Sequence, residues 1–331
     1  MSEILDFLKK TYVDRTPHMR EIGTYISSIE HARGSMVLPA RPEWLGDPVR
    51  GLMHPGPLIV LADSCCGLAV GAALDRDMTY ATLDLRMDYL RPAGPDRDVQ
   101  CDAHCFRLSR SVAFIRASVW QQDPEQPIAT AQATFMLGTP AGARPTPKAD
   151  STDPLPPEAF TSAAAAAVAA LAPSGSGERT SASRPGDSGE PAWIAPAASE
   201  PPLPGRSIPY VDYLGIRVAP DSRQPIFRMP FDPKLIGNPF LPALHGGTVA
   251  GFAETAAILH LNQTLRGEKL PKSIDFSLDY LRAGRPEETF ASCEVVRVGA
   301  RVALVTVRVW QRSPDYPIAV ARAHCLLTPR D

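Results

Sequence analysis

The chain carries the same sequence pattern twice, in the same order, in its two halves. Residues 82–91 read TLDLRMDYLR, and residues 273–282 read SIDFSLDYLR. The segment PIATAQATFML at 127–137 likewise recurs as PIAVARAHCLL at 317–327. Solenoid repeats have periods of roughly 20–50 residues, whereas each of these copies is long enough to form a complete domain. The repeat therefore predicts a duplicated domain and constrains both halves to one fold.

A segment rich in proline, serine, glycine and alanine separates the two copies. The 331 residues include 35 prolines, and many of them lie within 139–206, in stretches such as PTPKADSTDPLPPEAF. Sequence of this kind cannot bury enough apolar surface to offset the entropy lost on ordering. We therefore expect a first domain at 1–138 that includes an N-terminal helix, a linker at 139–206, and a second domain at 207–331.

Both copies show the same order of predicted elements. A strand comes first, at 24–36 in the first copy and at 211–218 and 226–229 in the second. One long apolar helix follows, at 57–74 and at 248–265, and about three alternating strands complete each copy. A single helix against an antiparallel sheet is an α+β arrangement. The first helix is apolar on all sides, which indicates burial around its whole circumference.

The overall charge and the apolar segments exclude several classes of partner. A formal net charge of −2 gives no reason to expect binding to nucleic acid or to an anionic membrane surface. The longest apolar run, 58–74, contains an acid and is shorter than the roughly 20 residues that cross a bilayer. The N-terminal residues lack the apolar core of a signal peptide. Six cysteines in a chain of this length are better interpreted as reduced thiols, so we expect a cytoplasmic protein.

The segment CDAHC contains three side chains that bind metals in other proteins. On a strand, Cys101 and Cys105 point to one face and His104 to the other, so the three cannot converge on one ion. The chain also lacks the glycine-rich loops that bind dinucleotides or phosphates. We therefore expect no metal and no cofactor.

One acid recurs inside each apolar helix. Asp63 is the only charged residue of PLIVLADSCCGLAVGAAL, and Glu254 occupies the matching position of the second copy. An unpaired carboxylate in an apolar setting is costly. Its presence in both copies favours a functional role, and the alternative is a structural acid that caps a neighbouring loop.

This pattern resembles the hotdog-fold acyl-CoA thioesterases of the phenylacetate-pathway (PaaI) type. The most specific element is NPFLPALHGG at 238–247, followed by Glu254. The resemblance covers both copies and implies tandem hotdog domains, each a curved antiparallel sheet around a long central helix. It also implies hydrolysis of an acyl-CoA substrate to free acid and CoA without a cofactor. Family members pair two such domains, so this chain would contain the dimer within itself, and further homo-oligomerisation is compatible with that arrangement.

The resemblance implies an active site shared between the copies. One site would combine Asn238, His245 and Gly246 of the second copy with Asp63 and Thr82 of the first. A carboxylate in an apolar setting has a raised pKa and can activate water. The N–H at a helix start provides both a donor and the positive end of the helix dipole for the oxyanion.

The second site would combine Asp47, His54 and Pro55 with Glu254 and Ser273. Proline has no N–H, so Pro55 cannot supply the donor that Gly246 supplies in the first site. Asp47 also places a negative charge where the first site has the neutral Asn238. We therefore expect the second site to be weak or inactive.

Three further residues are candidates for binding the substrate. Gly247 continues the helix start, and Arg110 and Arg301 flank the second hairpin of each copy, where they could meet the phosphates of coenzyme A. Solvated surface arginines are the more common case. His245 could equally pack against its loop or cap the helix, and Asn238 could be a turn residue before proline.

Two other functions are compatible with the same residues. Hotdog dehydratases and hydratases act on 3-hydroxyacyl or enoyl thioesters and also use a helix acid with a histidine, although the spacing of nine between His245 and Glu254 fits the thioesterase pattern better. A non-catalytic acyl-CoA binding protein is the second alternative. It is favoured if the missing N–H donor at Pro55 reflects a general loss of catalysis. The acyl chain, and the choice between CoA and a carrier protein, stay open at this point.

Overall fold

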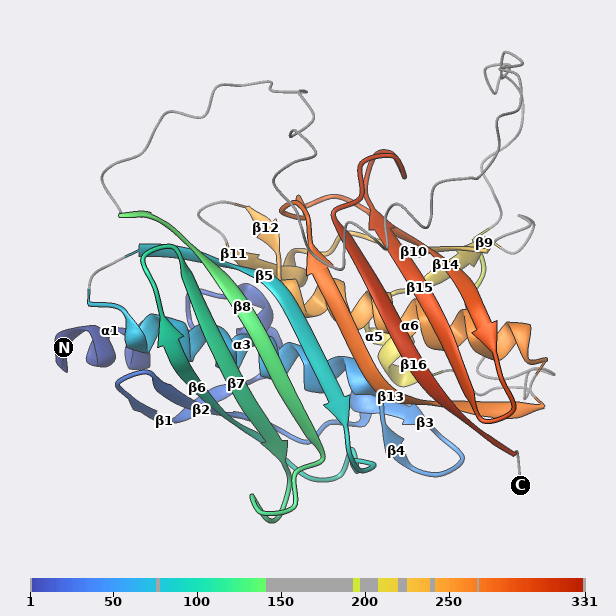
Figure 1. Ribbon diagram of the computed structural model, residues 1–331, viewed down its shortest axis with the longest axis horizontal. Coiled ribbons are helices and arrows are strands. Elements are labelled where there is room, and N and C mark those ends of the chain that lie inside the picture. The colour runs from blue at the N-terminus through green and yellow to red at the C-terminus, as the bar shows by residue number, and fades with distance from the viewer. Residues whose placement is uncertain are drawn as a thin grey trace.

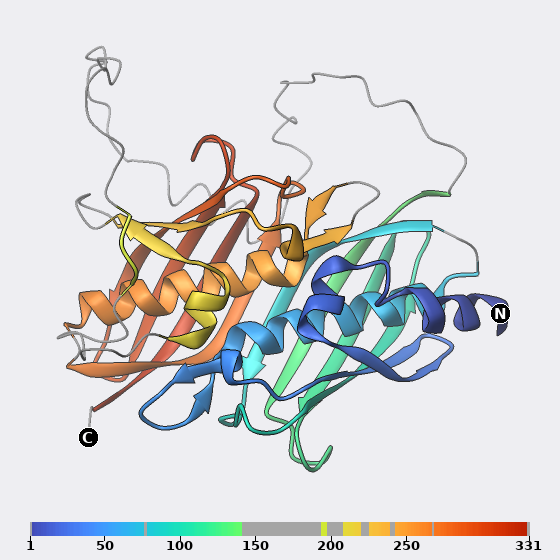
Figure 2. The same ribbon diagram turned by 180° about the vertical axis from the view of Figure 1, so that it is seen from behind.

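The two halves of the chain form two similar units that lie side by side (Figure 1). The structure is a computed structural model that describes residues 2–75, 78–140, 193–196, 208–219, 225–238, 242–266 and 268–329. One large antiparallel sheet forms a single layer across both units, and two long helices lie together on one of its faces (Figure 2).

The elements follow the same order in both halves. Those of the first half are α1 (Ser2–Thr11), α2 (Pro17–Ile22), β1 (Tyr25–Glu30), β2 (Arg33–Leu38), η1 (Pro42–Trp44), β3 (Leu45–Asp47), β4 (Leu52–Met53), α3 (Pro55–Ala73), β5 (Met78–Tyr89), β6 (Val99–Leu108), β7 (Val112–Trp120) and β8 (Ala129–Pro140). Those of the second half are α5 (Pro209–Tyr213), β9 (Arg217–Ala219), β10 (Ile226–Met229), η3 (Pro233–Leu235), β11 (Ile236–Asn238), β12 (Ala243–Leu244), α6 (Gly246–Thr264), β13 (Lys269–Tyr280), β14 (Thr289–Val298), β15 (Val302–Trp310) and β16 (Ala319–Pro329).

Pairing of β5 with β13 joins the two halves into one sheet. The strand order is β1-β2-β6-β7-β8-β5-β13-β16-β15-β14-β10-β9, and the two central strands run antiparallel with Asp88 opposite Asp275 and Asp84 opposite Asp279. Each half thus covers the edge that the other would leave exposed, and an exposed strand edge is a template for unwanted pairing. The α+β fold expected from the sequence, with tandem hotdog domains, is confirmed.

The central helices α3 and α6 are buried and cross near their N-terminal ends. Small residues allow the close approach: a Cβ atom on Gly247 would lie 2.6 Å from Val60 Cα, and one on Gly251 would lie 3.4 Å from Gly56 Cα. These two contacts are equivalent in the two copies, so the helices are related by an approximate twofold axis. Each helix start therefore lies beside the helix of the other copy.

Helix α3 is long and apolar enough to cross a membrane by composition alone. A stretch of 18 residues within this 19-residue helix has a mean hydropathy of 1.6, yet the whole stretch is buried inside the protein. A core helix enclosed by a sheet and a second helix has no polar face, which accounts for the composition. Cys101 and Cys105 of β6 point into this core, and His104 lies on the other face, as strand alternation predicts.

The strand predicted at 226–229 is confirmed as β10, whereas the other first strands predicted in the two copies were wrong in detail. Residues 24–36 form the hairpin of β1 and β2, which turns at Ala32 with a left-handed φ of 59°. Residues 211–218 begin instead within the short helix α5, where Pro209 occupies the first turn. Proline is well suited to that position because its fixed φ is helical and its missing N–H is not needed there.

Most of the predicted linker at 139–206 lies outside the described residues, so the domain boundaries stay a prediction. Of its described residues, 139 and 140 end β8, and 193–196 pack against the second copy. Ile194 forms a β-bridge with Val218, and the ring of Trp193 lies 6.1 Å from that of Phe290.

Candidate active site

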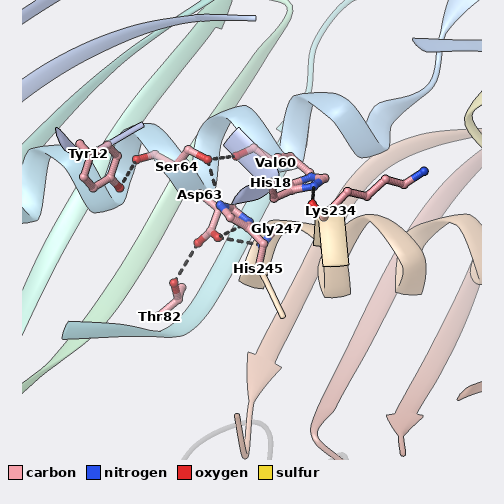
Figure 3. Close-up of polar contacts among 9 residues, drawn as sticks. All are labelled: Tyr12, His18, Val60, Asp63, Ser64, Thr82, Lys234, His245 and Gly247. Carbon is pink, nitrogen blue, oxygen red and sulfur yellow. Dashed lines mark hydrogen bonds and ion pairs between the residues drawn. The ribbon is translucent and has the colours of Figure 1, made fainter. Parts of the chain in front are cut away.

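Asp63 of α3 is held by groups from both copies of the fold. Its Oδ2 accepts a 2.7 Å hydrogen bond from the N–H of Gly247, the second residue of α6, and its Oδ1 accepts a 2.8 Å bond from the Thr82 hydroxyl of β5 (Figure 3). The side chain is 7% exposed. The expected juxtaposition of Asp63 and Thr82 with the helix start of the second copy is therefore present.

Two opposing effects act on the Asp63 carboxyl. Burial raises its pKa to about 6, although the hydrogen bonds from Thr82 and from the Gly247 N–H act in the opposite direction. A carboxylate with this pKa is mostly ionised at neutral pH and is a stronger base than a solvated one. Asp63 thus has the protonation state and the basicity that a general base needs.

His245 is the N-cap of α6, and its tautomer follows from its hydrogen bonds. Its Nδ1 accepts from the Gly247 N–H at 3.1 Å, and its Nε2 lies 3.2 Å from Ser64 Oγ. The Ser64 hydroxyl already donates to the Val60 carbonyl at 2.7 Å, so it accepts from His245 Nε2–H. Only a neutral ring with its proton on Nε2 satisfies all these bonds.

Burial also lowers the pKa of His245 to about 4, which keeps the ring neutral. The 3.6 Å approach of His245 Nδ1 to Asp63 Oδ2 is consequently not an ion pair. Instead, both acceptor atoms converge on the single N–H of Gly247. Together they fix the first turn of α6 against Asp63.

Sequence reasoning missed a second histidine at this place. His18 of α2 is buried, its Nδ1 lies 3.0 Å from the Lys234 carbonyl, and its ring lies 5.3 Å from that of His245. Burial, and to a smaller extent the neighbouring His245, lowers the pKa of His18 to about 3. The available signal was the Pro-His pair at the start of a short helix, which matches Pro209 and Tyr210 of the second copy.

Gly246 is the first residue of α6, so its N–H has no partner within the helix. A Cβ atom at this position would lie 2.9 Å from Asp63 Oδ2 and 3.3 Å from the hydroxyl of Tyr280. A larger side chain at this position would have to displace the Asp63 carboxyl. The helix start therefore presents an N–H next to the carboxylate, as expected of an oxyanion donor.

For three other expected residues, no contact with Asp63 is seen in the part of the chain that the structure describes. Asn238 ends β11 with an exposed side chain, and Arg110 and Arg301 are exposed in the turns that follow β6 and β14. Their roles in catalysis and in substrate binding stay predictions.

The equivalent arrangement around Glu254, the second constellation, has the same backbone elements as the Asp63 site but different side-chain contacts. Glu254 is 0% exposed, and its Oε2 accepts a 2.7 Å hydrogen bond from the Tyr89 hydroxyl. Burial raises the pKa of Glu254 to about 7, while the nearby hydroxyls of Tyr89 and Ser273 lower it. Ser273 is close to the carboxyl, but neither Ser273 Oγ nor Glu254 Oε1 makes a hydrogen bond of ordinary geometry to a described residue.

Tyr210 covers the helix start in this second constellation. His54 caps α3 by accepting from the Gly56 N–H at 3.0 Å, and the Tyr210 ring stacks on His54 at 4.6 Å. A Cβ atom on Gly56 would overlap the Tyr210 ring, and one on Gly251 would lie 2.7 Å from its hydroxyl. The first site has Val60 where the second has Gly251, so only the second has room for a ring as large as tyrosine.

Asp47 has a local role in a turn. Its carboxylate accepts from the N–H groups of Val49 and Arg50 and forms an ion pair with the Arg50 guanidinium at 2.6 Å. The charge that we expected to disturb the second site is therefore neutralised by its neighbour. The differences that remain at this helix start are Pro55, which has no N–H, and the covering Tyr210.

Two hotdog domains in one chain, with a buried carboxylate of one held against the helix start of the other, define a tandem hotdog protein. The thioesterase superfamily model matches residues 50–128 and 241–318, one segment in each copy. Over these two segments, which make up a little under half of the chain, the protein resembles the thioesterase superfamily, and each segment contains a central helix and the strands that follow it.

Individual proteins resemble this chain over one copy or over both. A curated protein named medium/long-chain acyl-CoA thioesterase YigI, from Salmonella typhimurium, is 28% identical over 149 residues, which cover 41% of this chain and 95% of the relative. A hotdog-fold protein from Alicyclobacillus acidocaldarius covers 96% of this chain and 98% of its own at 13% identity, with a TM-score of 0.58. The phenylacetic acid degradation protein PaaI from Thermus thermophilus is 28% identical, covers 36% of this chain and 97% of its own, and has a TM-score of 0.33.

Proposed function

We propose that the protein hydrolyses acyl-CoA thioesters to a free acid and CoA, at one composite site built around Asp63. The observation that carries this proposal is the Asp63 carboxylate held between Thr82 of its own copy and the N–H of Gly247 of the other, directly beside the N–H of Gly246. The match of both copies to the thioesterase superfamily model supports the reaction class. The name of the Salmonella relative supports medium- and long-chain acyl-CoA as substrates.

In the proposed reaction, Asp63 removes a proton from a water molecule as that water attacks the thioester carbonyl carbon. The negative charge that develops on the carbonyl oxygen is stabilised by the Gly246 N–H and by the positive end of α6. When the tetrahedral intermediate collapses, the carbon–sulfur bond breaks. The departing thiolate then takes the proton from the Asp63 carboxylic acid, so the base is regenerated.

The two histidines have a supporting role in this proposal. Both are buried and neutral, and His245 is held by Ser64 on one side and by the Gly247 N–H on the other. A neutral ring of low pKa is a poor proton donor at neutral pH. His245 therefore orients the helix start against Asp63, and the acid–base chemistry belongs to the carboxylate.

The constellation around Glu254 does not contribute to turnover in this proposal. Pro55 removes the donor, Tyr210 covers the helix start, and the carboxyl of Glu254 is fully enclosed. The protein then has one working site for its two copies.

The test is release of free thiol from short-, medium- and long-chain acyl-CoAs by purified protein, followed with a thiol-trapping dye. Asp63→Asn should lower kcat by roughly 10²-fold or more, as expected for loss of a general base. Glu254→Gln is the matched control and should change kcat little.

The outcomes separate the competing functions. A change in enoyl absorbance without thiol release would identify a hydratase or dehydratase. Binding of acyl-CoA without turnover would identify a binding protein. Loss of activity in Glu254→Gln together with full activity in Asp63→Asn would assign the working site to the other constellation.

A further inference from the structure

Tyr280 ends β13 and points its hydroxyl into the site around Asp63. The Tyr280 oxygen is buried and has no hydrogen-bond partner among the described residues. A Cβ atom on Gly246 would lie 3.3 Å from this oxygen and 2.9 Å from Asp63 Oδ2, so the phenol, the helix start and the carboxylate surround one small space. Leaving a buried hydroxyl without a partner costs free energy, and such a group requires an explanation.

The other copy shows what this tyrosine does when the acid can reach it. Tyr89 occupies the position that matches Tyr280, and its hydroxyl donates to Glu254 Oε2 at 2.7 Å. Asp63 is one methylene shorter than Glu254, and its two oxygens are engaged by Thr82 and by the Gly247 N–H. The Tyr280 hydroxyl is therefore left available inside the site, whereas the Tyr89 hydroxyl is consumed by the carboxyl.

The protonation state of the Tyr280 hydroxyl suits a hydrogen-bond donor. Burial, together with the nearby Asp63, raises the pKa of Tyr280 well above its usual range. The phenol thus keeps its proton at neutral pH. A phenol that always carries its proton and has no protein acceptor can donate a hydrogen bond only to a bound molecule.

We propose that Tyr280 is a catalytic residue that donates its hydroxyl hydrogen bond to the thioester carbonyl oxygen, as a second oxyanion donor beside the Gly246 N–H. This assignment rests on the proposed hydrolysis at the Asp63 site. The bond strengthens as the carbonyl oxygen becomes negative and weakens when the intermediate collapses, and Tyr280 neither gains nor loses a proton. Donation to the attacking water is less suitable, because it would occupy a lone pair of the nucleophile.

Tyr280→Phe tests this role because it removes only the hydroxyl and keeps the ring. With a medium-chain acyl-CoA that the wild-type protein hydrolyses, kcat should fall by about 10- to 100-fold, as expected for loss of one oxyanion donor. KM should change by less than about threefold, because a donor that acts in the transition state contributes little to ground-state binding. The melting temperature should stay the same or rise, since the lost hydroxyl has no partner among the described residues.

Tyr213→Phe is the matched control. It also removes a buried hydroxyl that has no partner among the described residues, but Tyr213 lies on α5, stacked on Tyr210 and against Trp44. Its kcat should equal that of the wild-type protein.

A second measurement distinguishes a donor from a residue that only shapes the pocket. A CoA analogue with a methylene in place of the thioester sulfur keeps the carbonyl, and the matching alkyl thioether lacks it. Tyr280→Phe should raise the carbonyl stretching frequency of the bound ketone analogue and should leave the affinity for the thioether unchanged. Equal weakening of both analogues would show a packing role and would overturn the proposal.

The two proposals fail in different ways. A wild-type protein that releases no thiol from any acyl-CoA overturns the proposed function and the role of Tyr280 with it. An active wild-type protein whose Tyr280→Phe variant keeps its kcat overturns the role of Tyr280 alone.

Discussion

Asp63 illustrates how single contacts decide what a buried acid does. Glu254 matches it in sequence, but its extra methylene brings its carboxyl to Tyr89, while Asp63 is held by Thr82 and a backbone N–H. The pKa is raised by burial in both, to about 6 for Asp63 and about 7 for Glu254. The shorter acid is therefore both the more ionised at neutral pH and the one that faces a free donor.

The raised pKa of Asp63 predicts the pH dependence of activity. The base must be ionised, so kcat/KM should rise with pH along a limb whose midpoint is near 6 and should level off above it. The measurement is the pH profile of kcat/KM for the wild-type protein. An acidic limb near pH 4, the range of an unperturbed carboxyl, would contradict this assignment.

The same shift predicts the effect of Asp63→Asn on stability. The folded state holds the Asp63 proton more tightly than the unfolded state, so wild-type stability falls as pH rises from 3.8 to about 6. The difference of roughly two pKa units corresponds to about 3 kcal/mol, an upper bound for what the variant regains above pH 7. Denaturant unfolding should show Asp63→Asn to be as stable as the wild-type protein or more stable at pH 8, and the gain should vanish near pH 4. A large loss of stability at pH 8 would show that the carboxylate is structural.

The start of each central helix decides which copy supplies a working donor. Both helices are capped by a histidine, and in both the N–H of the second residue bonds to that histidine. They differ at the first residue, which is Gly246 in α6 and Pro55 in α3, and in the group that lies over it. In the proposed mechanism, the same element is therefore an oxyanion site in one copy and only a structural helix start in the other.

Exchanging the residues at these starts should affect the two copies unequally. Gly246→Pro removes the N–H and places ring atoms against Asp63 and Tyr280, so kcat should fall by roughly 10²-fold or more. The control Pro55→Gly should leave kcat unchanged. Steady-state kinetics of the two variants, with melting temperatures to verify folding, provide the test.

Pro55→Gly with Asp47→Asn should likewise fail to create a second active site in an Asp63→Asn background. Tyr210 covers that helix start whatever residue stands at position 55. Recovery of activity in this triple variant would show that the ring moves aside for substrate.

The two copies form a pair that is symmetric in its fold but asymmetric in the residues at its two candidate sites. One continuous sheet and two crossing helices join the copies, and the candidate site draws Asp63 and Thr82 from one and the α6 start from the other. A pair of two identical copies would not bring together the acid and the helix start that form the proposed site. Two first copies would match Asp63 with the Pro55 start, and two second copies would match Glu254 with the Gly246 start.

Separating the halves should therefore abolish activity even if each half folds. Halves divided within residues 139–206 should show no thiol release when expressed singly, and co-expression should restore it by reforming the pairing of β5 with β13. The measurement is specific activity together with the mass of each species in solution. Full activity in an isolated first half would exclude a shared site.

Much of the candidate site could be inferred from the sequence because the duplication provides an internal comparison. The acid at 63 and 254, the histidine before each helix and the contrast between Gly246 and Pro55 are all visible in two aligned copies. His18 and Tyr280 are also visible in the aligned copies, opposite Tyr210 and Tyr89, but their importance, like that of Ser64, comes from partners that are distant in sequence. Asp47 was expected to place a charge in the second site, whereas a local contact to Arg50 neutralises it in a turn.

The sequence by itself determined the duplicated α+β fold, the burial of both central helices and the presence of one acid in each. Periodicity, apolar composition and repetition are properties of the chain itself. They can be recognised without knowing which residues are in contact in the folded protein. Only the tertiary structure decided that β5 pairs with β13, that Asp63 reaches the N–H of Gly247, and that Tyr210 covers the other helix start. Those outcomes depend on ångström-scale packing across the two copies, such as Gly251 where the first site has Val60. Side-chain volume at this contact, together with the contrast between Gly246 and Pro55 that is visible in the sequence, therefore distinguishes the two sites.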